Sequence, residues 1–267
     1  MRKSILIILA LALLAGTAYG ALGDLVASYD NIGTSTHYGL AADANYVYSF
    51  YYYSTWRYPT IRMRRSNGSF VSSYPNPLGT GSGQYYIRGL SYDGLGYLYY
   101  NNYSQRRVGR ARASNGALVS SWTWPSGTRY GICVDHGGTT GGTNIYQNYT
   151  TNTWWVSSLT GSQKRAFRAP VNNYSYDTAW DYGNKLIWCA NYNDEYIYGI
   201  LPSNGSVKAK FAFPVGPENP YGIAYWGNYL YVSSTSGTPD EYIWVFHCPA
   251  NVGVTPASVG KVKALFQ

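Results

Sequence analysis

The sequence predicts an all-β propeller of five four-stranded blades, and three observations support this fold class. First, the segments that close a unit are nearly alike: SNGSFVSSYPNP, SNGALVSSWTWP and SNGSVKAKFAFP, at residues 66–77, 114–125 and 203–214. Second, the turn glycines Gly68, Gly116, Gly161 and Gly205 are 48, 45 and 44 residues apart. Third, each period holds several short strands, and a four-stranded unit cannot bury both of its faces alone. Such units therefore stack radially around an axis.

Each unit is expected to contain four antiparallel strands, named a to d from the axis outward. In the last unit, strand a is 221–225, strand b is 229–233 and strand c is 242–246. Alternating apolar and polar residues support these assignments. The five sets open at Tyr38, Arg88, Tyr130, Tyr176 and Tyr221. The predicted blades are 37–77, 84–125, 128–170, 175–214 and 219–267, within one domain of residues 21–267.

Two kinds of turn recur between these strands. The a–b turns carry Asp43, Asp93, Asp135 and Asp181 with Gly or Asn nearby, which predicts Asx turns in which the carboxylate accepts backbone N–H groups. The c–d turns contain Asn-Gly pairs, a strong hairpin signal, at Gly68, Gly116 and Gly205. The repeated acidic residues are therefore interpreted as structural.

One outer strand is surplus to a five-bladed ring. Five d strands follow their own blades, the last at 261–266, and a sixth lies at 22–30. Its Gly23 precedes Gly68 by 45 residues, which is the same period. The N-terminal strand either closes the ring beside the last blade, displacing the C-terminal strand, or leaves to complete another subunit.

Residues 1–20 are typical of a signal peptide. Arg2 and Lys3 form a basic start, residues 5–15 an apolar core and residues 18–20 a small-x-small cleavage site. The alternative is an uncleaved membrane anchor, but the apolar run is short for a bilayer. The chain is thus expected to be secreted or held at the cell surface, with no membrane span after cleavage.

The composition suits short, aromatic-rich strands. Charged residues make up 12% and aromatic residues 18% of the chain, with 31 tyrosines, and the formal net charge is +8. The basic residues are spread over several blades without a Lys-rich run, so nucleic acid is not an expected partner. The three cysteines Cys133, Cys189 and Cys248 allow one bridge at most; they are expected to be buried free thiols or to form one incidental disulfide.

No catalytic, metal or cofactor site is predicted. The histidines His37, His136 and His247 lack the spacing of a metal site, and no nucleophile motif is present. The glycines of 137–142 lack the ending of a phosphate-binding loop and are interpreted as part of a long a–b loop. The acidic pairs at 194–195 and 240–241 are interpreted as solvated loop charge. The protein is therefore expected not to be an enzyme.

One group of side chains is a candidate ligand site. IRMRRSNG at 61–68 and VGRARASNG at 108–116 align on their glycines, so that Arg62 matches Arg110 and Arg64 matches Arg112. Period-two alternation places each pair on one face of its strand. The four guanidinium groups would bind carboxylates or phosphates; alternatively, they stack on nearby tyrosines.

Five Asn-x-Ser/Thr sequons are candidate glycosylation sites. They fall in predicted turns and loops, where an acceptor is exposed, at Asn67, Asn102, Asn148, Asn173 and Asn204.

Units such as YGIAYWGNYLYV (221–232) and ARASNGALVSSW resemble the repeats of secreted prokaryotic β-propellers of the NHL-like, quinoprotein-like and glutaminyl-cyclotransferase-like group. The resemblance covers the whole mature chain and rests on turn and packing residues. It implies a propeller and an extracytoplasmic location, and it carries no active site onto this chain.

The expected function is that of a non-enzymatic structural component of the cell surface. The surplus strand would join subunits head-to-tail into a filament. A first alternative is a lectin-like propeller, because runs such as 50–53 and 154–155 hold more Tyr and Trp than blade packing needs, and cell-surface polysaccharide would be its partner. A second is a glutaminyl-cyclotransferase-like enzyme, which would need an acid lining the central channel.

Overall fold

The structure is a computed structural model of the whole chain. It describes residues 20–30, 37–51, 59–78, 87–124, 127–136, 143–149, 152–171, 175–214, 219–235 and 242–250. Residues 1–19 of the expected signal peptide, the glycine-rich loop at 137–142 and the expected strand at 261–266 lie outside these ranges. Within the described ranges, no helix is long and apolar enough to span a lipid bilayer.

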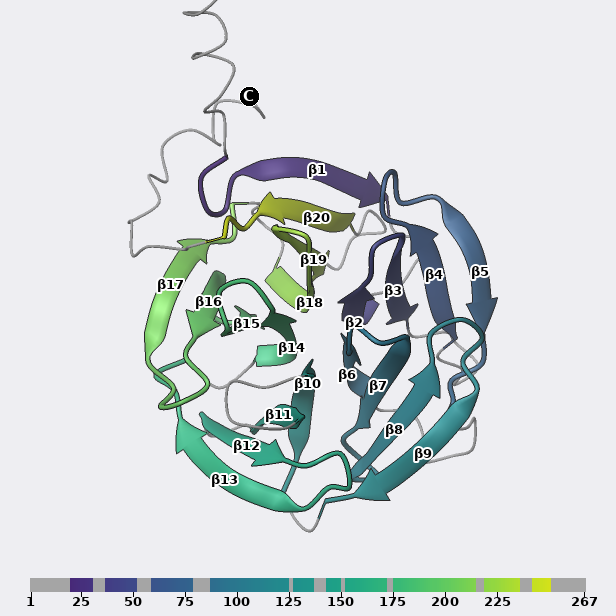
Figure 1. Cartoon of the computed structure of the whole chain (residues 1–267). Helices are drawn as coiled ribbons and strands as arrows, with labels where there is room; N and C mark the ends of the chain where they lie inside the picture. The colour runs from purple at the N-terminus through teal and green to yellow at the C-terminus, as the bar shows by residue number, and fades with distance from the viewer. Residues whose placement is uncertain are drawn as a thin grey trace, which may run out of the picture.

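The described strands form five four-stranded antiparallel sheets arranged around one axis (Figure 1), which confirms the predicted five-bladed propeller. The first two blades are β2 (His37–Ala42), β3 (Tyr46–Tyr51), β4 (Thr60–Arg64) and β5 (Phe70–Tyr74), then β6 (Ile87–Tyr92), β7 (Tyr97–Asn102), β8 (Arg107–Arg112) and β9 (Leu118–Thr123). The next two are β10 (Arg129–Asp135), β11 (Asn144–Tyr149), β12 (Thr153–Ser157) and β13 (Gln163–Arg168), then β14 (Ser175–Asp181), β15 (Leu186–Asn191), β16 (Tyr196–Ile200) and β17 (Val207–Ala212).

The fifth blade joins the two ends of the described chain. It consists of β18 (Asn219–Trp226), β19 (Tyr229–Thr235), β20 (Tyr242–His247) and, outermost, β1 (Leu25–Asp30). β1 pairs antiparallel with β20, from Leu25 opposite Phe246 to Asp30 opposite Tyr242. Figure 1 shows β1 lying along β20 on the outside of the ring. The N-terminal strand therefore closes its own ring, the first of the two arrangements expected for it.

A repeated aromatic contact links each blade to the next around the circumference. The glycine of each c–d turn, and Gly23 at the corresponding place before β1, has a positive φ. A Cβ added to any of them would lie within 3 Å of the outer strand of the preceding blade. In each case an aromatic side chain near the end of that outer strand packs on the glycine. The pairs are Tyr29 with Gly68, Tyr74 with Gly116, Trp122 with Gly161, Phe167 with Gly205 and Phe211 with Gly23. Because Gly23 completes this cycle, the repeat of the turn glycine explains why residues 25–30 belong to the fifth blade.

We expect Gly116→Ala to destabilise the protein more than Gly96→Ala does. Both glycines have a positive φ, 72° and 97°, so each alanine is strained by about 1–2 kcal/mol. Nothing lies within 4 Å of a Cβ at Gly96, whereas a Cβ at Gly116 would meet the Tyr74 ring at 2.2 Å. Forcing that ring away adds about 1–3 kcal/mol, which urea denaturation of the two variants measures. Equal losses would show that the contact is not needed.

The core lies between blades, and the cysteines are part of it. All three are buried free thiols, which confirms one of the two expected states. Cys133 and Cys189 belong to the apolar cluster between the third and fourth blades, and Cys248 belongs to the one between the fourth and fifth. Burial raises the pKa of Cys189 to about 12, so this thiol stays protonated at neutral pH.

Candidate binding site

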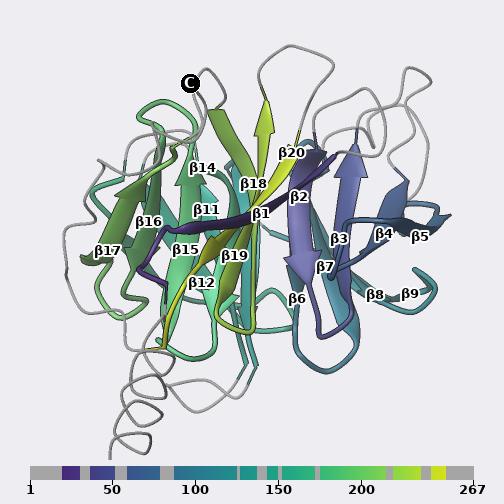
Figure 2. The same cartoon turned by 90° about the horizontal axis from the view of Figure 1, so that it is seen from above.

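The five innermost strands β2, β6, β10, β14 and β18 run in the same direction around the axis, so their first residues meet at one end of the channel (Figures 1 and 2). The openers of the five repeats lie at these strand starts, as the second residue of β2, β6, β10 and β14 and the third residue of β18. Two further tyrosines, Tyr103 and Tyr192, join them from the turns after β7 and β15. We call the set the tyrosine–arginine mouth: Tyr38, Arg88, Tyr103, Tyr130, Tyr176, Tyr192 and Tyr221.

The tyrosine rings of the mouth contact one another continuously. Tyr176 and Tyr221 are stacked, with ring centroids 4.2 Å apart, and Tyr38 meets Tyr221 edge-on at 5.1 Å. Tyr130 bridges Tyr103 and Tyr176, with centroids 5.4 and 5.5 Å away. Apart from the buried Tyr221, the tyrosines of the mouth are half-buried, so the surface combines aromatic rings with hydroxyl groups.

Arg88 is the one opener that is not a tyrosine. Its Nη1 donates a hydrogen bond of 2.5 Å to the Tyr221 hydroxyl, and its guanidinium carbon lies 4.3 Å from the centroid of the Tyr38 ring. Burial acts to lower the pKa of Arg88, but the tyrosine oxygens outweigh it and the net shift is upward. The guanidinium therefore remains charged.

Asp177 lies one residue further along the channel and is completely buried. Its Oδ2 accepts hydrogen bonds from the backbone N–H groups of Leu40 (2.9 Å) and Ile223 (3.2 Å), and its Oδ1 accepts one from Leu90 (3.3 Å). One carboxyl thus ties β14 to the inner strands of three other blades. Burial raises the pKa of Asp177 well above its usual range, although its backbone hydrogen bonds act in the opposite direction.

Sequence reasoning identified the openers as strand starts and did not single out Asp177. A signal was present, because the residue after each opener is glycine in the four other repeats, at Gly39, Gly89, Gly131 and Gly222. Those glycines lie close to neighbouring side chains and backbone at the axis. Asp177 is therefore the one residue at this position that is not glycine, and it lies where the inner strands of the blades converge.

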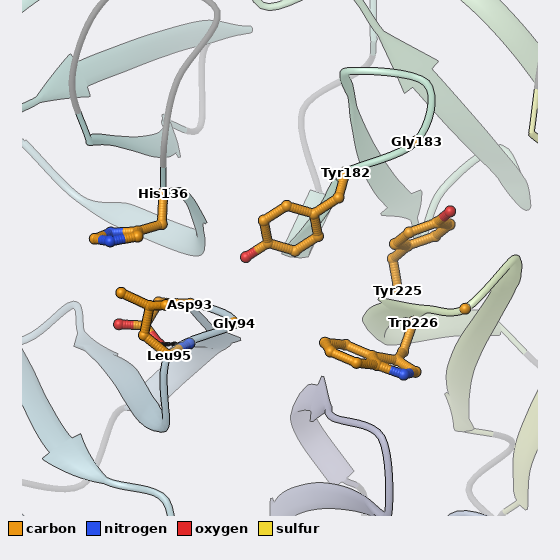
Figure 3. Close-up of a pocket in the computed structure, with 9 residues that line it drawn as sticks. Asp93, Gly94, Leu95, His136, Tyr182, Gly183, Tyr225 and Trp226 are labelled. Carbon is orange, nitrogen blue, oxygen red and sulfur yellow. Dashed lines mark hydrogen bonds between the residues drawn. The ribbon is translucent and has the colours of Figure 1, made fainter.

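The opposite end of the channel holds a cavity of about 470 Å³, where a–b turns converge (Figure 3). Figure 3 shows the rings of Tyr182, Tyr225 and Trp226 on one side and His136 on the other.

Asp93 also lines this cavity, but its Oδ1 accepts the N–H groups of Leu95 and Tyr97 in its own turn. The structural role predicted for Asp93 is therefore confirmed, as are the similar roles of Asp43 and Asp181.

The four candidate arginines differ in their surroundings. Arg62 and Arg110 are half-buried and lie over tyrosine rings, 4.6 Å from the Tyr46 centroid and 3.7 Å from that of Tyr97. This is the stacking alternative considered for them. Arg64 and Arg112 are exposed at the ends of their strands, and Arg64 lines a cavity of about 500 Å³ between β1 and the first blade.

The sequons differ in exposure. Asn67 and Asn204 lie in exposed turns, as expected, and Asn173 is outside the described residues. Asn102 and Asn148 are buried, so the expectation of exposure was wrong for these two. The Asn102 side chain accepts a bond from the Gln105 N–H, and Asn148 accepts one from the Gly131 N–H. Both amides complete backbone hydrogen bonding at the ends of b strands.

The described residues include no group of three His, Cys, Asp or Glu side chains placed to hold a metal ion.

The comparisons with known proteins show the fold. A glutaminyl cyclase from Myxococcus xanthus is similar at a TM-score of 0.65 and 12% identity, over 85% of this chain and 98% of that one. The protein U3-55K is similar at 0.50 and 10% identity, over 80% and 79%, and virginiamycin B lyase from Staphylococcus aureus at 0.46 and 17%, over 82% and 73%. No family model and no curated protein matches the sequence. The likeness to propellers such as the glutaminyl cyclase is one of fold.

Proposed function

We propose that the protein is an exported, non-enzymatic propeller that binds sugar chains of the cell surface at the tyrosine–arginine mouth. The observation that carries this proposal is the convergence of six tyrosines and one arginine at one end of the channel. Aromatic rings contact the apolar faces of sugars, and phenolic hydroxyls act both as donors and as acceptors toward sugar hydroxyls.

The surroundings of Asp177 favour binding over catalysis. The carboxyl group is the acid that a cyclotransferase-like reaction would need in the channel, yet its oxygens accept backbone N–H groups and have no contact with solvent. A general acid or base must reach the proton that it transfers. Cyclisation of a peptide with N-terminal glutamine by the purified protein, lost in Asp177→Asn, would contradict a purely binding role.

Titration calorimetry with cell-surface polysaccharides tests the binding proposal. We expect Tyr192→Ala, at the half-buried edge of the mouth, to weaken binding by about tenfold, because one ring contact contributes about 1 kcal/mol or more. Trp226→Ala, in the cavity at the opposite end, is the matched control and should bind normally. No binding of any polysaccharide, at low as well as physiological salt, would contradict the proposal.

A structural role through self-assembly is a second proposal. Its support is the position of β1, which pairs only with β20 among the described strands and has no fully buried residue. Such an outer strand can exchange between copies, because an unpaired β20 edge offers N–H and C=O groups to any matching strand. Electron microscopy of the secreted material tests this role. Filaments that persist after deletion of residues 22–30 would exclude strand exchange, and a monomer at high concentration would exclude assembly.

A further inference from the structure

Arg88 is a half-buried cation, and no carboxylate in the described part of the chain pairs with it. Its neighbours are tyrosines: one hydroxyl accepts from Nη1, and four rings lie within 5.8 Å of its guanidinium carbon. Burial raises the pKa of Tyr221, so this partner stays neutral and cannot act as the counter-charge. A half-buried guanidinium is less screened by water than a fully exposed one, so it attracts an opposite charge more strongly.

The unused hydrogen-bonding capacity of Arg88 indicates which anion would fit. Its Nε is buried and has no hydrogen-bond partner among the described residues. The Tyr38 ring lies over the guanidinium, whose N–H groups point outward in its own plane. Carboxylates bind arginine in this plane, accepting two parallel N–H bonds.

We propose that the tyrosine–arginine mouth selects sugar chains that carry carboxylates, namely polyuronates, and that Arg88 binds the carboxylate of one uronate residue. This inference rests on the proposed function and names its ligand class. A uronate residue combines a carboxylate with hydroxyls on the same ring. The mouth likewise sets one guanidinium among six tyrosines with their hydroxyls. An acidic peptide would use the charge and leave most of these hydroxyls without sugar partners.

The test compares polygalacturonate with its fully methyl-esterified form, which has the same backbone without the charge, on the full-length mature protein at physiological salt. We expect the wild type to bind the acid form at least about tenfold more tightly, because a hydrogen bond to a charged group contributes about 1.5 kcal/mol or more. Arg88→Gln should remove this preference. Arg110→Gln is the matched control: Arg110 also lies over a tyrosine ring, and its loss changes the net charge equally. It should retain the preference.

Equal binding of the two polymers would overturn the inference and leave the proposed function standing. Binding of neither would overturn both. Equal binding of polyglutamate would show that charge alone is recognised, and it too would overturn the uronate assignment. Because Arg88→Gln could disturb folding, a second measurement uses the wild type only. Free galacturonate should displace bound polymer at about tenfold lower concentration than galactose, and equal potency would contradict the proposal.

Discussion

Replacing Asp177 by alanine is expected to lower the free energy of unfolding by about 3–6 kcal/mol, a large part of the stability of a single domain. The reason is the hydrogen bonding at the axis. The substitution leaves the N–H groups of Leu40, Leu90 and Ile223 without an acceptor in a buried position, and each unsatisfied donor costs about 1–3 kcal/mol. Urea denaturation measures the loss. Asp30→Ala, at an exposed position on β1, is the control and should change stability little.

The titration of Asp177 gives this prediction a pH dependence. Its pKa in the folded protein is raised, so the folded state binds the proton more tightly than the unfolded chain does. The corresponding stabilisation is complete at acid pH below the unfolded pKa and is lost as pH rises through the raised folded pKa. We expect Asp177→Asn, which cannot titrate, to lack this decline, so that its deficit relative to the wild type is greatest at low pH. A deficit that grows with pH instead would show that the carboxyl is ionised in the folded state.

Deleting β1 should destabilise the ring by about 3 kcal/mol or more, equivalent to a fall in Tm of roughly 10 °C for a protein of this size. The deletion uncovers the edge of β20 and removes the packing of Leu25 and Tyr29. It also removes the hydrogen bond of 2.5 Å from the Tyr29 hydroxyl to the Arg65 carbonyl, which crosses to the first blade. Thermal denaturation followed by circular dichroism measures the change.

A synthetic peptide of residues 22–30 should restore the Tm of the truncated protein, because it can refill the position beside β20. The same peptide with Tyr29→Ala should restore less, since it lacks the ring that packs on Gly68. An unchanged Tm after truncation would show that closure by β1 contributes nothing, and failure of the peptide to rescue would argue against exchange of β1 between copies.

The fold was predictable because it repeats. The turn glycines and the Asx aspartates are local features that recur with one period, and the phase of Gly23 identified residues 22–30 as an outer strand. Whether that strand closes its own ring did not follow from the sequence; the pairing of β1 with β20 in the structure showed it. The axis was not predictable in the same way. Asp177 meets Leu40, 137 residues away, and Arg88 meets Tyr221, 133 residues away, and neither contact follows from the pattern within one repeat. Alternation also could not reveal that Asn102 and Asn148 are buried at the ends of b strands. The residues that break the repeat are Arg88, which lies in the mouth, and Asp177, which lies buried next to it in the sequence of β14.

A crystal structure of the protein with a short oligogalacturonate tests the location of the ligand site most directly. The proposed function and the inference about Arg88 together predict sugar rings on Tyr130 and Tyr192, and a carboxylate within hydrogen-bond distance of the Arg88 Nε. Sugar bound instead beside Trp226, in the cavity at the opposite end of the channel, would contradict the assignment of the tyrosine–arginine mouth as the binding site.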